Sequence, residues 1–135
     1  MRFSSLVLLS LILSGCESDQ KVTSHVEIAK PITLTAKQIA SVRAGVAKSF
    51  KDSDLQAVSV GRMIAGRTST AVVVCGFVDG KNKSGESVGE KPFHGLFMGM
   101  DNASGFIVTG TGGADNDTAA TFEVCRRSGL ELAPS

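Results

Sequence analysis

Apolar positions are spaced differently in successive parts of the chain, and each spacing predicts a different kind of segment. The first apolar block is compact: every residue from Leu6 to Leu13 is apolar except Ser10. Arg2 supplies a positive charge before the block, and small residues follow it up to Cys16. A charged start, a short apolar stretch and small residues, in this order, are typical of an export signal that is cleaved off.

A membrane-spanning helix is a poorer interpretation of this segment. Residues 3–15 would form a helix about 20 Å long, at a rise of roughly 1.5 Å per residue. The hydrocarbon core of a bilayer is about 30 Å thick and requires roughly 20 residues. We therefore predict that residues 1–15 are a signal peptide.

The segment Leu13–Cys16 also resembles the lipobox of bacterial lipoproteins, in which the cysteine thiol receives diacylglycerol before cleavage. The resemblance implies that Cys16 becomes a lipid-modified N-terminus that holds the protein on a membrane. Two or three acyl chains would make detachment slow, because each buried methylene contributes about 0.8 kcal/mol. By the same resemblance, a residue other than aspartate after the cysteine, here Glu17, implies the outer membrane. An ordinary secretory signal followed by a chance cysteine is the alternative.

Helical spacing begins after a polar segment, residues 16–32, which we interpret as a flexible tether. Thr35 is placed to cap the N-terminus of a helix, and Gln38 completes a capping box three residues later. Apolar residues then recur at spacings of three and four, which predicts an amphipathic helix over residues 36–50. The apolar stripe consists of Ile39, Val42, Val46 and Phe50.

Alternating apolar positions predict four strands further along the chain, at residues 57–64, 69–78, 92–100 and 106–110. The second of them is apolar on both faces, which predicts a central place in the sheet. In the first, Val58, Val60 and Ile64 are expected on one side, and residues 65–68 are expected to form a hairpin turn.

A polar loop rich in glycine and lysine, Asp79–Lys91, is expected between the second and third strands. Asp117 is placed to cap a last helix that runs to about Ser128, and Gly129 suits the position just past its end. We predict the α+β class: an N-terminal helix packed on a small antiparallel sheet of about four strands, plus a short C-terminal helix. Residues 33–135 are expected to form this single domain.

Composition limits the function classes. Cleavage before Cys16 leaves 120 residues, which is enough for one domain. Arg2 is the only charged residue removed, so 13 basic and 13 acidic residues remain. The chain has neither Trp nor Tyr. A neutral chain without these aromatic residues lacks the charge and the stacking platforms that nucleic-acid binding uses, so we predict no nucleic-acid partner.

The cysteines fit an exported protein. Once Cys16 is assigned to lipid, Cys75 and Cys125 remain. In an oxidising compartment two such thiols usually form a disulfide, so we predict this pair. Two buried free thiols are the alternative.

The segment Gly85–Gly89 matches the G-x-S-x-G pattern of a hydrolase nucleophile elbow. An elbow requires a strand-to-helix turn and a nearby histidine, whereas Ser87 lies in the predicted polar loop. His94 is the one histidine outside the predicted tether. We predict no catalytic residues, and a small serine hydrolase that uses Ser87 and His94 is a remote alternative.

No metal or cofactor site is predicted. Asp115, Asn116 and Asp117 bring oxygen ligands together after a glycine-rich stretch, but no downstream glutamate completes a calcium loop. The stretch Val108–Ala114 resembles a phosphate-binding turn between a strand and a helix, but the negative charges of Asp115 and Asp117 would oppose a phosphate there. Helix capping therefore explains these residues better. His25 and His94 lack partners at metal-ligand spacing, and His94 is expected to be half-buried or at an edge.

The central stretch resembles a family of small uncharacterised exported proteins and lipoproteins of proteobacteria. The matching positions are Lys51-Asp52, Val74-Cys75-Gly76, Lys81-Asn82, Gly85, Gly89, Pro92-Phe93 and the late Cys125. The resemblance is dense over about 20 residues of the family pattern V-C-G-x-V-N-x-K-N-x-x-G-x-Y-x-G-x-x-P-F. This chain departs from it at Ser53, Asp79 and Ser87, where the family has proline, asparagine and tyrosine. The resemblance implies export and a strand–loop–strand unit, and no activity.

We therefore expect a membrane-anchored, non-enzymatic lipoprotein of the cell envelope that presents the loop Asp79–Lys91 to a protein partner. A periplasmic inhibitor or immunity protein, directed against a toxin or a cell-wall enzyme, is the alternative from a second class. The expected partner-binding residues in the loop are Lys81, Asn82, Lys83, Gly85, Ser87, Gly89 and Lys91.

Overall fold

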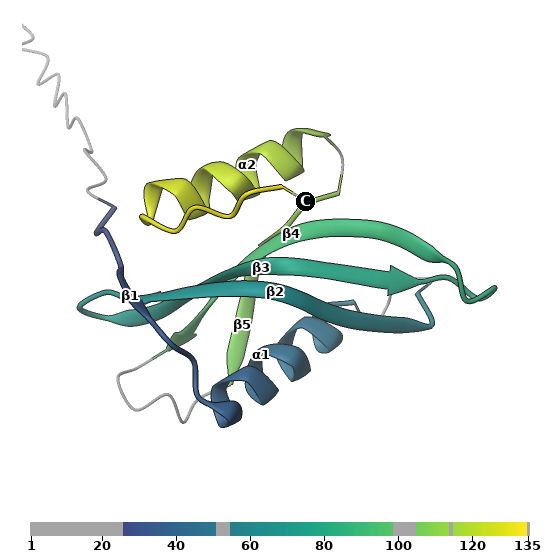
Figure 1. Cartoon of the computed structure of the whole chain (residues 1–135), viewed down its shortest axis with the longest axis horizontal. Helices are drawn as coiled ribbons and strands as arrows, with labels where there is room; N and C mark the ends of the chain where they lie inside the picture. Colours follow the sequence, from purple (N-terminus) through teal and green to yellow (C-terminus); the bar gives the residue numbers. More distant parts are fainter. Residues whose placement is uncertain (1–25, 51–54, 99–104, 114, 135) are drawn as a thin grey trace, which may run out of the picture.

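A computed structural model describes residues 26–50, 55–98, 105–113 and 115–134 of the chain. The described residues form a five-stranded antiparallel sheet in the order β1-β2-β3-β4-β5, with one helix on each face (Figure 1). This arrangement confirms the predicted α+β class. In chain order the elements are β1 (Lys30–Ile32), α1 (Ala36–Ser49), β2 (Ala57–Arg67), β3 (Ala71–Lys81), β4 (Ser87–Met98), β5 (Phe106–Thr111) and α2 (Asp115–Arg127).

The capping box at the start of α1 is confirmed. The backbone N–H of Gln38 donates to the Thr35 hydroxyl at 3.2 Å, and the Thr35 N–H donates to the Gln38 side-chain oxygen at 2.8 Å. Two backbone donors that the helix itself cannot satisfy therefore have partners. Val42 and Val46 are fully buried against the sheet, and Phe50 ends the helix as its C-cap.

Replacing Thr35 with alanine is expected to lower the free energy of unfolding by about 1 kcal/mol, because the Gln38 N–H loses its acceptor. The matched control is Thr33→Ala, which removes the same atoms from an exposed residue just outside the cap. Urea denaturation of the two variants measures the difference. Equal stabilities would mean that the cap does not contribute.

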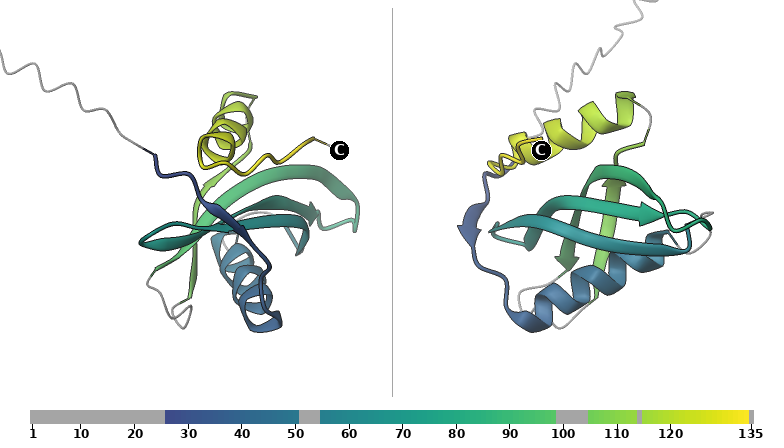
Figure 2. Two further views of the ribbon diagram at one scale, coloured as in Figure 1. Left: turned by 60° about the vertical axis from the view of Figure 1, so that its left-hand side comes forward. Right: turned by 45° about the vertical axis from the view of Figure 1, so that its right-hand side comes forward.

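Strand β3 separates two cores, as its alternation predicted. Towards α1 it buries Val72, Val74 and Val78, together with Phe93, Phe97 and Phe106. Towards α2 it buries Cys75 and Phe77, together with Cys125, Leu130 and Leu132. Helix α2 and the C-terminal residues lie above the sheet and α1 lies below it (Figure 2).

For the part of β2 after Val60, we predicted the wrong side of the sheet for the apolar side chains. The register between β2 and β3 shifts between Val60 and Met63, so the alternation of side chains is interrupted there. Met63 therefore joins Val58 and Val60 against the α1 core, and Ile64 packs against the other core. Arg62, within the irregularity, donates to the Ala133 carbonyl at 2.6 Å.

The predicted hairpin turn at residues 65–68 was also misplaced, because β2 continues to Arg67. The turn lies at Thr68–Ala71, where the Thr68 hydroxyl accepts hydrogen bonds from the N–H groups of Thr70 and Ala71 at 3.3 and 3.1 Å. A threonine side chain can organise a turn in this way without glycine.

Strand β1 was not predicted, and it raises the strand number from about four to five. It pairs with the end of β2, Lys30 opposite Arg67 and Ile32 opposite Ala65. Three residues that include a proline are too few for alternation to be visible in the sequence. Strand β1 and the buried Ala29 before it lie in the last part of the segment that we interpreted as a tether.

Helix α2 begins at Asp115, two residues before the predicted cap, so Asp117 lies in its first turn. Negative charge is favourable there, because the first N–H groups of a helix carry partial positive charge. The helix end is as predicted: Gly129 has φ +78°, and the N–H groups of Gly129 and Leu130 donate to the carbonyls of Arg126 and Cys125.

The predicted disulfide is present. Cys75 of β3 and Cys125 of α2 are bonded, with their Cα atoms 6.1 Å apart, and both side chains are fully buried. The bond ties α2 to the centre of the sheet across 50 residues of sequence.

Candidate functional site

The segment predicted as the loop Asp79–Lys91 is mostly strand. β3 continues to Lys81 and β4 begins at Ser87, and pairs such as Asp79 with Glu90 extend the ladder. Only residues 82–86 form the turn. The prediction was wrong in extent because residues 87–90, at the start of β4, are exposed on both faces of the strand, and such residues show no apolar alternation.

The turn of this hairpin is held by Asn82. Its side-chain oxygen accepts hydrogen bonds from the N–H groups of Ser84 and Glu86, both at 3.0 Å. Gly85 has φ +80°, a conformation that residues with a Cβ rarely adopt. The tip is therefore a shaped turn supported by a paired ribbon.

The structure places the predicted partner-binding residues on the outer part of the β3–β4 hairpin. Five of them are exposed, and two, Asn82 and Lys91, are partly buried. Val88 adds an exposed apolar side chain to this mixed surface. The exposed five are Lys81, Lys83, Gly85, Ser87 and Gly89.

Ser87 and His94 are not brought together. The Ser87 hydroxyl is within 2.8 and 2.6 Å of the two carboxylate oxygens of Asp79. His94 is seven residues further along β4, roughly 23 Å away at about 3.3 Å per residue. Nδ1 of His94 lies 2.7 Å from the hydroxyl of Thr109 on β5. The geometry therefore provides no Ser87–His94 pair for nucleophilic catalysis.

His94 is half-buried, as predicted, and burial lowers the pKa of its imidazole below 6.5. The folded state therefore favours the neutral ring, and the unfolded chain takes up a proton at a higher pH than the folded protein does. Stability is expected to fall as the pH drops below about 6.5 and through the lowered folded-state pKa.

Thermal unfolding of the wild type and of His94→Gln between pH 8 and pH 5 tests this expectation. The wild type should lose more of its unfolding temperature on acidification than the variant, because glutamine does not titrate. Parallel pH profiles would contradict the expected contribution of His94.

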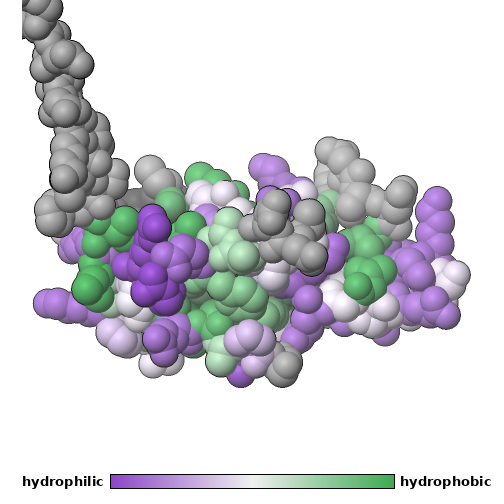
Figure 3. Space-filling model, turned by 90° about the horizontal axis from the view of Figure 1, so that it is seen from above, coloured by the Kyte–Doolittle hydropathy of each residue, from purple (hydrophilic) through white to green (hydrophobic). Residues whose placement is uncertain are grey.

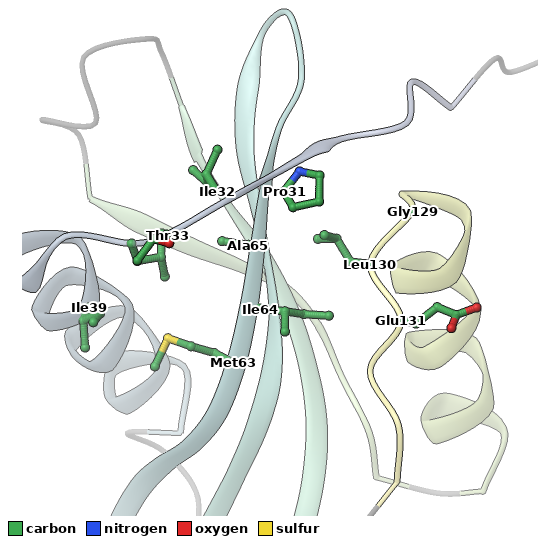
Figure 4. Close-up of a pocket in the computed structure, with 11 residues that line it drawn as sticks. Pro31, Ile32, Thr33, Ile39, Met63, Ile64, Ala65, Gly129, Leu130 and Glu131 are labelled. Carbon is green, nitrogen blue, oxygen red and sulfur yellow. The ribbon is translucent and has the colours of Figure 1, made fainter.

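A groove that the sequence did not indicate opens at the edge of the sheet where β1 meets β2 (Figure 4). Its volume is about 460 Å³. Met63 and Ile39 lie on the α1 side, Ile64 and Leu130 lie on the α2 side, and Ala65 lies between them. The groove is mostly apolar, and Glu131 is its charged lining residue.

The groove joins three separate parts of the chain, residues 31–39, 63–65 and 129–131. No local motif marks such a site, so sequence reasoning missed it. Two of these parts, strand β1 and residues 63–65 of β2, are also the ones that we missed or placed on the wrong side of the sheet from the sequence.

Within the described ranges, no three His, Cys, Asp or Glu side chains come close enough together to hold a metal ion. In the same residues, no helix has the length and apolar content needed to cross a bilayer. Cys16 and the predicted signal peptide lie outside the described residues, as do the side chains of Asp115 and Asn116.

Comparison of the chain with protein-family models, with curated proteins and with solved structures found no match.

Proposed function

We propose that this chain is a bacterial lipoprotein, anchored through Cys16, whose folded domain is a non-enzymatic interaction module of the cell envelope. The β3–β4 hairpin is the surface that it presents to a protein partner. The proposal combines the export signal and lipobox of the sequence with the position of the hairpin in the fold.

One observation carries the proposal: the hairpin tip and the start of the described chain lie at opposite ends of the sheet. β1 pairs with the Arg67 end of β2, whereas Lys81, next to the tip, pairs with Ala57 at the other end. The 11 residues of β2 separate these ends by roughly 35 Å at about 3.3 Å per residue. Figure 1 shows β1 and the hairpin tip at opposite sides of the molecule. A domain held on a membrane through its N-terminus would therefore present the hairpin away from the lipid.

The chemistry of the tip suits a protein surface better than a small molecule. The ribbon offers charges of both signs, a shaped turn at Asn82 and an exposed Val88. A small ligand needs a concave wall if most of its surface is to be buried, and the four grooves found among the described residues are lined by other parts of the chain. A backbone fixed by ladder pairing loses little conformational entropy when a partner binds.

The test is affinity capture from envelope membranes with the full lipidated chain as bait. The variant Lys83→Glu/Val88→Ser changes the charge and removes the apolar side chain at the tip. The matched control, Lys37→Glu/Ile107→Ser, makes the same changes on α1 and β5, where both side chains are also exposed.

The tip variant is expected to capture at least tenfold less partner than the wild type, whereas the control should capture as much as the wild type. Denaturation curves of both variants should match the wild type, which separates lost binding from lost folding. Equal capture by wild type, tip variant and control would exclude the hairpin as the binding surface.

A further inference from the structure

Two exposed apolar side chains, two positions apart in sequence, lie where the described chain begins. Ile28 is 72% exposed and Val26 is 49% exposed, whereas Ala29 beside them is 2% exposed. Isolated apolar residues are ordinary on protein surfaces. These two differ because their position in the chain places them closest to the proposed lipid anchor.

A third exposed apolar side chain belongs to the same end of the molecule. The Ala29 N–H donates to the Ser128 carbonyl at 2.9 Å, and the Ser128 N–H donates to the Val124 carbonyl at 3.1 Å. Val124, one helical turn before Ser128, is 40% exposed. Seen from above, hydrophobic surface lies at the end of the domain where β1 begins, and further hydrophobic surface lies in the middle and towards the opposite end of this face (Figure 3). We call Val26, Ile28 and Val124 the anchor-side patch.

The charges around the anchor-side patch nearly cancel. The Glu27 carboxylate accepts hydrogen bonds from the hydroxyl and N–H of Ser69 at 2.6 and 2.9 Å, and these bonds lower its pKa. Glu123 pairs with Arg126 and Arg127, whose hydrogen bonds lower its pKa to about 2. Lys30 and Arg67 lie opposite each other at this end, and Glu131 acts on Arg126, so four basic and three acidic groups surround the patch. Its attraction to a membrane would therefore come from apolar contact and depend little on lipid charge.

The length of chain before the patch decides what can cover it. Val26 lies ten positions after Cys16, and even fully extended backbone over ten positions spans at most about 35 Å. A bilayer holding Cys16 is therefore always within reach of the patch. A short link gives an effective concentration in the millimolar range, so even weak insertion would be well populated.

We propose that the anchor-side patch inserts into the interface of the bilayer that holds the lipid anchor, so that the domain rests on the membrane with its hairpin pointing outward. The inference rests on the proposed lipoprotein function and adds the surface that contacts the membrane. Apolar side chains that insert between headgroups and acyl chains are the usual contact of membrane-surface proteins.

The absence of tryptophan from the sequence allows a direct test. Full-length lipidated protein is reconstituted in phosphatidylcholine vesicles as two single-tryptophan variants, Ile28→Trp in the patch and Val88→Trp on the hairpin. Both original side chains are exposed, so the larger ring can be accommodated at either position. Emission wavelength and quenching by brominated phosphatidylcholine report contact with acyl chains, and vesicle flotation reports anchoring.

Tryptophan at position 28 is expected to emit at shorter wavelength on vesicles than in buffer and to lose most of its intensity with brominated lipid. Tryptophan at position 88 should show neither effect. Adding Val26→Asp and Val124→Asp to the Ile28→Trp variant should restore the emission seen in buffer while flotation is unchanged.

Two results overturn the inference, and they are distinguishable. If the protein floats with the vesicles and both tryptophans emit as in buffer, the patch does not insert, while the lipid anchor stands. If the protein fails to float and behaves like its Cys16→Ser variant, the anchor itself is refuted, and the inference with it.

Discussion

Replacing both Cys75 and Cys125 with alanine is expected to lower the free energy of unfolding by about 4 kcal/mol, for a loop of about 50 residues. The disulfide limits the conformations of the unfolded chain, and removal of the crosslink gives that freedom back. A loss of this size is a large part of the 5–15 kcal/mol that is typical of single domains. In the folded protein the bond also holds α2 on the sheet, since both cysteines are fully buried in the core between them.

Urea denaturation in a Cys16→Ser background measures the loss without a third thiol. The control is Val124→Ala, which shortens an exposed side chain next to Cys125 on α2 and should change stability little. Treatment of the parent with reductant should reproduce the double variant. Two reactive thiols in unreduced, denatured parent protein would contradict the disulfide.

Replacing Phe93 with alanine is expected to lower the free energy of unfolding by about 3–5 kcal/mol, the range for a large buried aromatic side chain. Phe93 is fully buried between the sheet and α1, and its ring packs edge-to-face with Phe106 at a centroid distance of 6.2 Å. The ring lies against Gly76 of β3, where an added Cβ would be only 2.8 Å from a ring carbon. Truncation would leave a cavity that these rigid strands fill poorly.

Ile107→Ala is the control for this prediction, because Ile107 is about half exposed on β5 and its loss creates no enclosed cavity. Thermal and urea unfolding should place the Ile107 variant close to the wild type and the Phe93 variant far below it. Similar stabilities of the two variants would mean that the core between the sheet and α1 is not as tightly packed as described.

The elements that the sequence predicted well are those in which one local rule dominates. Helix α1 combines a capping box at Thr35 with an apolar stripe, and both act within the helix itself. Strand β3 has apolar residues on both faces because it separates two cores. The end of α2 at Gly129 follows from the positive φ that a glycine adopts easily.

The elements that were missed or misplaced depend on partners distant in sequence. β1 is a strand only because Ala65, Gly66 and Arg67 lie beside it. The facing of Met63 and Ile64 depends on the register against β3, which the residues of β2 do not reveal by themselves. The extent of the β3–β4 hairpin was hidden because its outer residues are polar on both faces.

The same distinction applies to the candidate surfaces. The Cys75–Cys125 pair was predictable because the predicted export signal implies an oxidising compartment, in which two available thiols usually form a disulfide. The sequence indicated that residues 79–91 are polar, but the predicted shape of this segment was wrong, because most of it is strand and not loop. The groove beside Ala65 combines residues from three parts of the chain, so only the folded structure reveals it.

The central claim is that the mature protein begins at a lipid-modified Cys16, and intact-mass and N-terminal peptide mass spectrometry of protein purified from membranes tests it most directly. The account predicts that residues 1–15 are absent and that Cys16 carries diacylglycerol, with or without a further acyl chain on its amine. A mature chain that keeps residues 1–15, or one that begins at an unmodified Cys16, would contradict it.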